Sequence, residues 1–170
     1  MAGGGFGRRA TPTAEWVREA VGVASELTKA GQRGPVKVMW SREDDMRAGY
    51  YRPFTLHRAE IGFDAQGKVL AWEHRIVSQS IVSGSPFEGF MVQKGVDMTT
   101  TEGMREPYDV PMQLSVHHPK VNVPVLWWRS VGSTHTAYVM ETLIDEIAAA
   151  TKQDPVAYRM ALMSDDKKAA

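Results

Sequence analysis

The residues whose types and spacing best suit ligand binding form a glycine-rich stretch, Gly3–Arg9, which reads GGGFGRR. Glycine lets the backbone come close to another group, and backbone amides that precede a helix favour an anion. The two arginines add positive charge and forked donors, so phosphate is the natural ligand to expect. A flexible chain end is the simpler alternative. Phe6, set between glycines, favours the binding hypothesis because a linker typically carries small polar residues there.

A second stretch of this kind lies at Trp128–Gly132, which reads WRSVG. An apolar, strand-like run leads into Arg129, and a helix is expected to begin directly after Gly132. An arginine between a strand and a helix suits the recognition of an oxyanion, and it suits a structural ion pair equally well. The residues alone leave both interpretations open.

Other polar groups are more simply explained by structure than by chemistry. Ser41 followed by Glu43, Asp44 and Asp45 is typical of a capped helix start, which we favour over a metal site because adjacent acids on one turn point in different directions. His57 and His74 face each other across an expected strand pair, where a hydrogen-bonded role is more common than a metal-binding one. The pair His117-His118 cannot chelate one ion from a regular strand, where neighbouring side chains point to opposite faces.

The hydrophobic periodicity predicts an α/β (α+β) fold, with a β-hairpin in a mixed sheet and two main helices packed on it. The first helix is expected at residues 13–30, with Thr11 as N-cap and Pro12 at its first position. The second main helix is expected at 134–151. The remaining expected elements are a strand at 36–40, hairpin strands at 54–63 and 68–81 joined by the turn 64–67, a strand at 109–116, and a helix from Asp154-Pro155 to Met163.

Composition excludes several classes of function. Lysine plus arginine and aspartate plus glutamate are equal at 20 each, so no basic field favours nucleic acid as a partner. Cysteine is absent, which excludes disulfides and iron–sulfur ligation by this chain. No apolar run approaches membrane length, so we expect no membrane insertion. We divide the chain into residues 1–82, an irregular segment 83–108, and residues 109–170, and we expect it to be a piece of a longer protein.

Together these stretches resemble the molybdenum-binding large subunit of the xanthine dehydrogenase and aldehyde oxidase family, in particular the isoquinoline 1-oxidoreductase beta subunit. The glycine loop and the WRSVG loop carry the resemblance. It continues through segments that lie in the same order along the chain: Val36–Asp45, Tyr51-Arg52-Pro53, the 64–67 hairpin, Ile144-Asp145-Glu146 and Asp154-Pro155.

The resemblance implies that Gly5, Phe6, Gly7 and Arg129 contact a molybdenum–molybdopterin cofactor, in its cytosine dinucleotide form. Val131 stands where relatives place an aromatic residue facing the substrate, which implies a differently shaped substrate pocket. Ala10 stands where purine-oxidising relatives have a glutamate, which favours a nitrogen heterocycle or an aldehyde as substrate.

The resemblance also implies what this chain lacks. The glutamate base of the family belongs to a later region of the subunit, so no catalytic residue and no direct metal ligand is expected here. The implied partners are the remainder of the large subunit, an iron–sulfur small subunit and a small substrate, with water as the oxygen source. We therefore expect the chain alone to hold no cofactor and to be inactive. A dinucleotide-binding domain, suggested by a GxGxxA match at residues 5–10, and a non-catalytic orphan fragment are the alternatives.

Overall fold

A computed structural model describes residues 3–168, with residues 167 and 168 described by their backbone only. The chain divides into two compact units, which are described here one at a time. The first unit takes the chain up to Arg52 together with Val123–Arg129, and the second holds Pro53–Asn122 and the chain from Ser130 onward.

The first unit contains two helices, α1 (Glu15–Lys29) and α2 (Arg42–Ala48). The predicted cap at Thr11 is wrong, because Ala14 occupies the N-cap position in a left-handed conformation without a side-chain cap. Gly31 has a φ of 78° just beyond the last turn, as expected for a glycine that ends a helix. Ser41 and Asp44 form a complete capping box at α2, which confirms the structural interpretation of that acidic cluster.

The predicted strand at residues 36–40 is absent, since this segment has no strand to pair with and is irregular throughout. A strand needs a neighbour to accept and donate its backbone hydrogen bonds, and alternation alone does not supply one. The indole of Trp40 instead donates to Glu19 on α1 at 2.5 Å. The only extended pairing in the described part of this unit is a single parallel bridge between Tyr51 and Val125.

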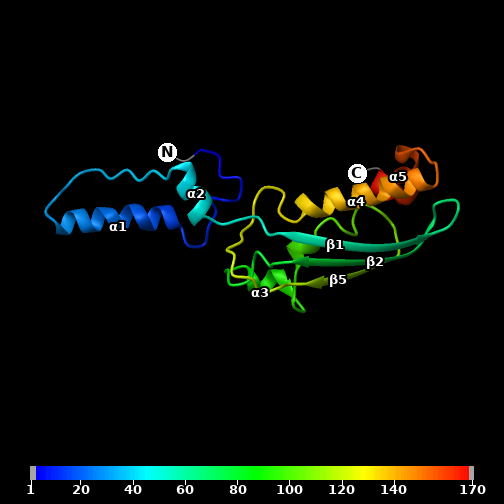
Figure 1. Cartoon of the computed structure of the whole chain (residues 1–170), viewed down its shortest axis with the longest axis horizontal. Coiled ribbons are helices and arrows are strands. Elements are labelled where there is room, and N and C mark those ends of the chain that lie inside the picture. The colour runs from blue at the N-terminus through cyan, green and yellow to red at the C-terminus, as the bar shows by residue number, and fades with distance from the viewer. Residues whose placement is uncertain (1–2, 169–170) are drawn as a thin grey trace. The chain divides into compact units, whose positions relative to one another are not determined.

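The second unit is built on a three-stranded mixed sheet of order β1-β2-β5 (Figure 1). β1 (Thr55–Phe63) and β2 (Val69–Ser78) pair antiparallel, which confirms the predicted hairpin. Its turn places Gly67 at a φ of 80°, where a side chain would be strained. β5 (Met112–His117) pairs parallel with β2, so the strand expected from Asp109 begins three residues later.

One face of the sheet packs against α4 (Ser133–Ala150), which lies along the strands (Figure 1). α4 buries Thr136, Met140, Ile144, Ile147 and Ala148, at the spacing of one helix face. The four apolar residues of this set meet the inward-facing side chains of β2, led by Trp72 and Ile76, in a single apolar core. The expectation that α1 also covers the sheet is not confirmed, because α1 has no buried residue and belongs to the first unit.

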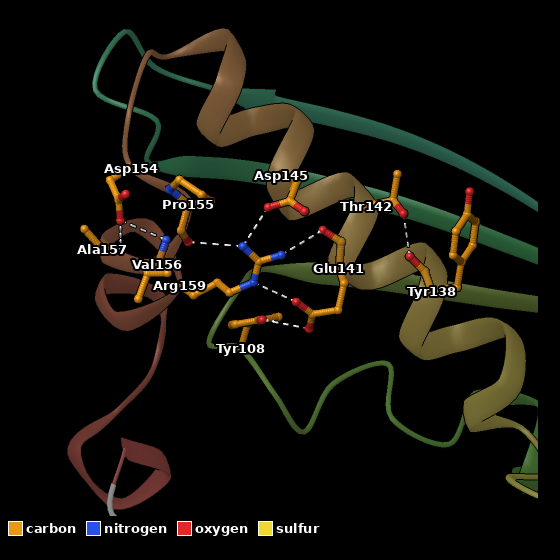
Figure 2. A network of polar contacts seen from close by, with 10 residues as sticks. All are labelled: Tyr108, Tyr138, Glu141, Thr142, Asp145, Asp154, Pro155, Val156, Ala157 and Arg159. Atoms are coloured by element: carbon orange, nitrogen blue, oxygen red, sulfur yellow. Dashed lines mark hydrogen bonds and ion pairs between the residues drawn. The ribbon is translucent and has the colours of Figure 1, made fainter.

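α5 (Pro155–Leu162) is fastened to α4 by the polar network of Figure 2. Asp154 caps α5 as predicted, accepting hydrogen bonds from the amides of Val156 and Ala157. Arg159 bonds both Glu141 and Asp145 at 2.7 Å. Tyr108 donates to the second oxygen of Glu141, also at 2.7 Å. Burial and then this hydrogen bond raise the pKa of Tyr108 to about 12, so its hydroxyl stays protonated.

The segment between β2 and β5 holds short elements around a buried carboxylate. These are α3 (Glu88–Met91), β3 (Val92–Gln93), β4 (Val96–Asp97) and the 3-10 turn η1 (Met98–Thr101). Asp97 is fully buried and accepts hydrogen bonds from Ser80, Ile81 and Thr99. A last short helix, α6, covers Asp165–Lys168. None of the described helices is both long enough and apolar enough to cross a membrane.

Candidate cofactor-binding loops

The glycine stretch and the first two residues of the second stretch, Trp128 and Arg129, lie side by side in the first unit. The backbone N–H of Arg129 donates to the carbonyl oxygen of Phe6 at 2.8 Å. The guanidinium of Arg52 donates to the carbonyl of Arg129 at 3.1 Å, so the second loop is held from both sides. The structure thus brings together Phe6 and Arg129, which the sequence analysis assigned to one ligand.

Gly7 is required by its surroundings as well as by its backbone. Its φ is 83°, and an added Cβ would lie 3.2 Å from the carbonyl oxygen of Trp127 and 3.3 Å from the Cα of Trp128. Any larger residue would therefore push the two loops apart. Phe6 is also in a left-handed conformation, with a φ of 50°, and its side chain is 63% exposed. An exposed aromatic ring on a strained backbone is typical of a residue kept for contact with something else.

Gly5 differs from Gly7, because a side chain there would be tolerated. An added Cβ would lie 3.7 Å from the Cβ of Arg9, an ordinary van der Waals distance. The Gly5 carbonyl accepts a hydrogen bond from the Arg9 amide at 3.3 Å, and the Gly7 carbonyl accepts one from Ala10 at 3.0 Å. Both glycines therefore belong to one tight turn, with Gly7 at its closest approach to the second loop.

Arg8 does not offer its charge to a ligand, contrary to the expectation for the arginine pair. Its side chain is buried, bonds Glu15 at 2.9 Å and lies 3.6 Å from Asp45. Its guanidinium also lies over the ring of Tyr50, 5.5 Å from the centroid. Burial raises the pKa of Glu15, but the hydrogen bonds led by that from Arg8 outweigh it, and the pKa lies below its ordinary value. Arg8 therefore forms internal ion pairs with Glu15 on α1 and Asp45 on α2, and these pairs fix the loop to both helices.

Beside the glycine loop lies a hollow of about 520 Å³, lined by the loop, by α1 and by residues 38–40. Arg9 and Trp16 face it, with the guanidinium 5.9 Å from the centre of the indole ring. Arg9 also lies 3.5 Å from Asp45, so its charge is partly balanced. The positive charge available to an anion at this loop is correspondingly smaller than the sequence suggests.

Val131 belongs to the second unit, whereas Arg129 is the last residue of the first. Ser130 and Val131 both have positive φ, 69° and 40°, which is uncommon for any residue but glycine and rarer still for the β-branched Val131. Gly132 packs directly against the Thr99 carbonyl, leaving no space for a Cβ. Backbone strain next to a tightly packed glycine fixes the conformation of this segment at the start of α4.

The first unit also contains features that fit an oxygen-rich cofactor. Among the described residues, the buried indole N–H of Trp128 has no hydrogen-bond partner, and the Trp127 and Trp128 backbone comes within 3.3 Å of the place that a Cβ on Gly7 would take. An unsatisfied buried donor beside a glycine turn is a place where a ligand oxygen would lower the free energy. Across residues 3–168, no group of three or more histidine, aspartate or glutamate side chains could hold a metal ion. The indole N–H of Trp128 is a donor, which suits an oxygen of an organic cofactor.

The family is shown by comparison with known proteins. Residues 1–163 match the family described as the molybdopterin cofactor-binding domain, and the chain belongs to that family. It is 30% identical over 172 residues to the isoquinoline 1-oxidoreductase subunit beta of Brevundimonas diminuta, covering 100% of this chain and 21% of that protein. It is 28% identical to the aldehyde oxidoreductase molybdenum-binding subunit of Escherichia coli, covering 93% of this chain and 20% of that subunit.

Solved structures agree at the level of the fold. The aldehyde oxidoreductase of Desulfovibrio desulfuricans superposes with a TM-score of 0.68 at 20% identity, over 97% of this chain and 17% of that one. Quinoline 2-oxidoreductase of Pseudomonas putida gives a TM-score of 0.67 at 22% identity, over 98% of this chain and 20% of that one. The mixed α/β fold is thus that of molybdopterin-binding oxidoreductases, and this chain spans about a fifth of the relatives' length.

The dinucleotide-binding alternative loses its structural basis. That motif requires a strand, the glycine turn, a helix and a second parallel strand. Within the described residues α1 is followed by irregular chain and α2, and the first strand, β1, belongs to the second unit.

Sequence reasoning missed Arg52 as a member of the loop assembly, and it placed Trp128 in the second loop without giving that residue a role. Tyr51-Arg52-Pro53 carried part of the family resemblance, and that was the available signal for Arg52. No pattern in the sequence indicated that the Trp128 indole N–H would be buried without a partner.

Proposed function

We propose that this chain supplies two cofactor-contacting loops to a molybdenum hydroxylase that oxidises nitrogen heterocycles or aldehydes with water as the oxygen source. The observation that carries the proposal is the 2.8 Å hydrogen bond from the Arg129 amide to the Phe6 carbonyl. It joins the two loops that the family resemblance assigns to one cofactor. Membership of the molybdopterin cofactor-binding family supports the same assignment.

The roles follow from the backbone and side chains of the loops. Gly5 and Gly7 let backbone amides approach a cofactor oxygen, and Phe6 offers an exposed ring beside it. Arg129 donates forked, charge-assisted hydrogen bonds to an oxygen of the pterin or of a phosphate, and a cytosine dinucleotide form of the cofactor would offer a diphosphate. The bound group supplies the hydroxylation and redox chemistry of the reaction. The chain's own contribution is binding and orientation.

The substrate class is proposed from two positions. Val131 is half-buried and smaller than an aromatic residue, so the substrate side of its loop is less restricted. Ala10 has no carboxylate with which to orient a purine. Both features favour a simple nitrogen heterocycle or an aldehyde. The names of the relatives support this choice, since they are isoquinoline and aldehyde oxidoreductases.

The proposed partners follow from the short span of the match. The remainder of the large subunit would enclose the cofactor and supply the base, and an iron–sulfur small subunit would remove electrons. This chain contributes no cysteine to an electron path.

The test is Arg129→Met in the full-length subunit. Loss of a charge-assisted contact is expected to weaken cofactor retention by about 1.5–3 kcal/mol, while the strand bridge and α4 remain intact. Molybdenum content, measured by mass spectrometry, should fall relative to Arg18→Met, which removes an exposed arginine of α1. Full molybdenum content with a large loss of thermal stability would instead make Arg129 a structural residue.

A second test addresses the chain by itself. Two loops keep a binding geometry only when the surrounding shell fixes them. Purified residues 1–170 are therefore expected to contain no stoichiometric molybdenum and to show no dye-linked oxidation of isoquinoline or aldehydes. Tight molybdopterin binding with turnover would overturn the assignment of the base to another part of the subunit.

A further inference from the structure

Three histidines of the second unit form one hydrogen-bonded chain. His74 on β2 meets His57 on β1, with 2.8 Å between Nε2 and Nδ1. The other nitrogen of His57, Nε2, lies 2.9 Å from Nδ1 of His135 in the first turn of α4. At the far end, the indole N–H of Trp72 donates to Nδ1 of His74 at 3.2 Å. The chain therefore runs from the middle of the sheet to the start of α4.

The indole fixes every proton in this chain. A tryptophan N–H can only donate, so His74 Nδ1 must be bare and a neutral His74 carries its proton on Nε2. That proton is donated to His57 Nδ1, so His57 carries its own proton on Nε2 and donates it to His135 Nδ1. His135 is then left with its proton on Nε2. A single tautomer of each ring satisfies all three contacts.

When all three rings are neutral, the hydrogen-bonded chain of histidines has no site for a further proton. Each ring-to-ring contact holds one proton, the outer nitrogen of His135 holds one, and Nδ1 of His74 holds none. These sites hold three protons, one for each neutral ring. A fourth proton puts two donors face to face in at least one contact, whichever ring takes it. Protonation of any of the three histidines therefore breaks a hydrogen bond of the chain.

The described residues that face His57 and His74 from the packed strands and helix are apolar. Inward-facing neighbours are Ala59 and Ile61 on β1, Ile76 on β2, Leu114 on β5 and Met140 on α4. Among the described residues, the titratable groups on these inward faces are the histidines themselves. Glu102, whose carbonyl accepts a hydrogen bond from Thr136, is the carboxylate that packs beside the first turn of α4. His74 is fully buried, and burial followed by the charge of His57 lowers its pKa to about 4; burial also lowers the pKa of His57.

We propose that Trp72, His74, His57 and His135 form an acid-sensitive lock that holds the first turn of α4 against the sheet. The neutral chain joins both hairpin strands to that turn, and uptake of one proton releases it. The lock acts on the segment of the second unit that contains Val131 and Gly132, directly before α4. It does not depend on whether a cofactor is bound.

The sign of the pH dependence follows from the lowered pKa values. Between the ordinary histidine value of 6.5 and about 4, the open state binds a proton that the locked state does not. The histidines' contribution to the stability of the locked state is therefore fully present above pH 6.5 and is lost as the pH falls toward 4. One proton changes the opening constant by at most about tenfold for each pH unit.

The experiment compares the 170-residue chain with its His57→Gln variant by hydrogen exchange, corrected for intrinsic rates. The probes are the amides of His135 and Thr136, which both bond the Gly132 carbonyl. In the unmodified chain their protection should fall about tenfold from pH 6 to pH 5. Glutamine offers an acceptor and a donor but takes up no proton at these pH values, so His57→Gln should lose most of this dependence. His117→Gln, at an exposed position of β5, should keep it.

A measurement on the unmodified chain keeps the proposal testable if the variant fails to fold. Nitrogen-15 spectra of the imidazole rings at pH 7 should show His57 and His74 as neutral rings protonated on Nε2. A proton on Nδ1 of either ring, or titration of either ring near pH 6.5, would overturn the lock. Equal pH dependence in the unmodified chain and in His57→Gln would do the same.

Discussion

The two long helices show how little an apolar pattern says about burial. α1 and α4 both carry apolar residues at helical spacing, and both were expected to pack on the sheet. α4 buries five residues, four of them in the apolar core of the second unit, whereas α1 buries none and leaves Val21 62% exposed. Of the buried apolar residues in the part of the chain that the structure describes, Leu126 alone lies in the first unit. Periodicity thus predicts that a helix forms, but whether its apolar face is buried depends on the elements that pack against it.

This contrast predicts a large difference between matched truncations. Ile144→Ala removes a fully buried side chain of α4 and should cost about 2–5 kcal/mol of unfolding free energy. Val21→Ala on α1 should change stability by less than about 0.5 kcal/mol, because its side chain is already largely in water. Urea denaturation followed by circular dichroism would measure both. Equal losses would show that α1 is covered after all.

The next largest effect is expected at the carboxylate of the irregular segment. Asp97→Asn turns an NH₂ group toward donors that now bond both carboxylate oxygens, among them Ser80 Oγ and the hydroxyl of Thr99. Leaving buried donors unsatisfied should cost about 1–3 kcal/mol. Glu26→Gln, at an exposed acid of α1, is the matched control and should be nearly silent. A silent Asp97→Asn would mean that water already reaches this site.

The loss of an ion pair should also destabilise the second unit more than the first. Arg159→Met removes the bonds to Glu141 and Asp145 shown in Figure 2, and it should cost about 1–2 kcal/mol, because the arginine side chain is only 22% exposed. Lys29→Met breaks a pair exposed by 69% and 73%, which should cost about 0.5 kcal/mol or less. Melting temperatures at low and high salt would compare them, and similar shifts would remove the distinction.

The predictions that the structure confirms concern features that residues close in the sequence determine. The hairpin turn at Gly67, the box of Ser41 with Asp44, and the Asp154 cap each depend on a few neighbours, and each is confirmed. The strand at 36–40 failed because pairing needs a partner from elsewhere in the chain.

In the candidate site, too, some features could be predicted from the sequence and others depend on the tertiary structure. The resemblance selected Phe6 and Arg129, which the fold brings together, while their contacts with a cofactor stay predictions. The burial of Arg8 against Glu15 and Asp45 could not be predicted, since it depends on how α1 and α2 meet the loop. Alternation did predict that His57 faces His74. The third ring, His135, comes from a helix whose register on the sheet only the tertiary structure fixes.

The smallest expected effect on global stability tests the loops themselves. Gly7→Ala places a Cβ at a φ of 83° and against the Trp127 carbonyl, which should cost about 1–2 kcal/mol locally. Because that strain falls on the contact between the loops, the Arg129 amide, which donates to Phe6, should exchange about tenfold faster. The unfolding midpoint of the second unit should not move. Gly5→Ala is the matched control, since its Cβ would meet Arg9 at an ordinary 3.7 Å. Equal acceleration by both variants would show that the glycine loop is held by something other than its approach to Trp127.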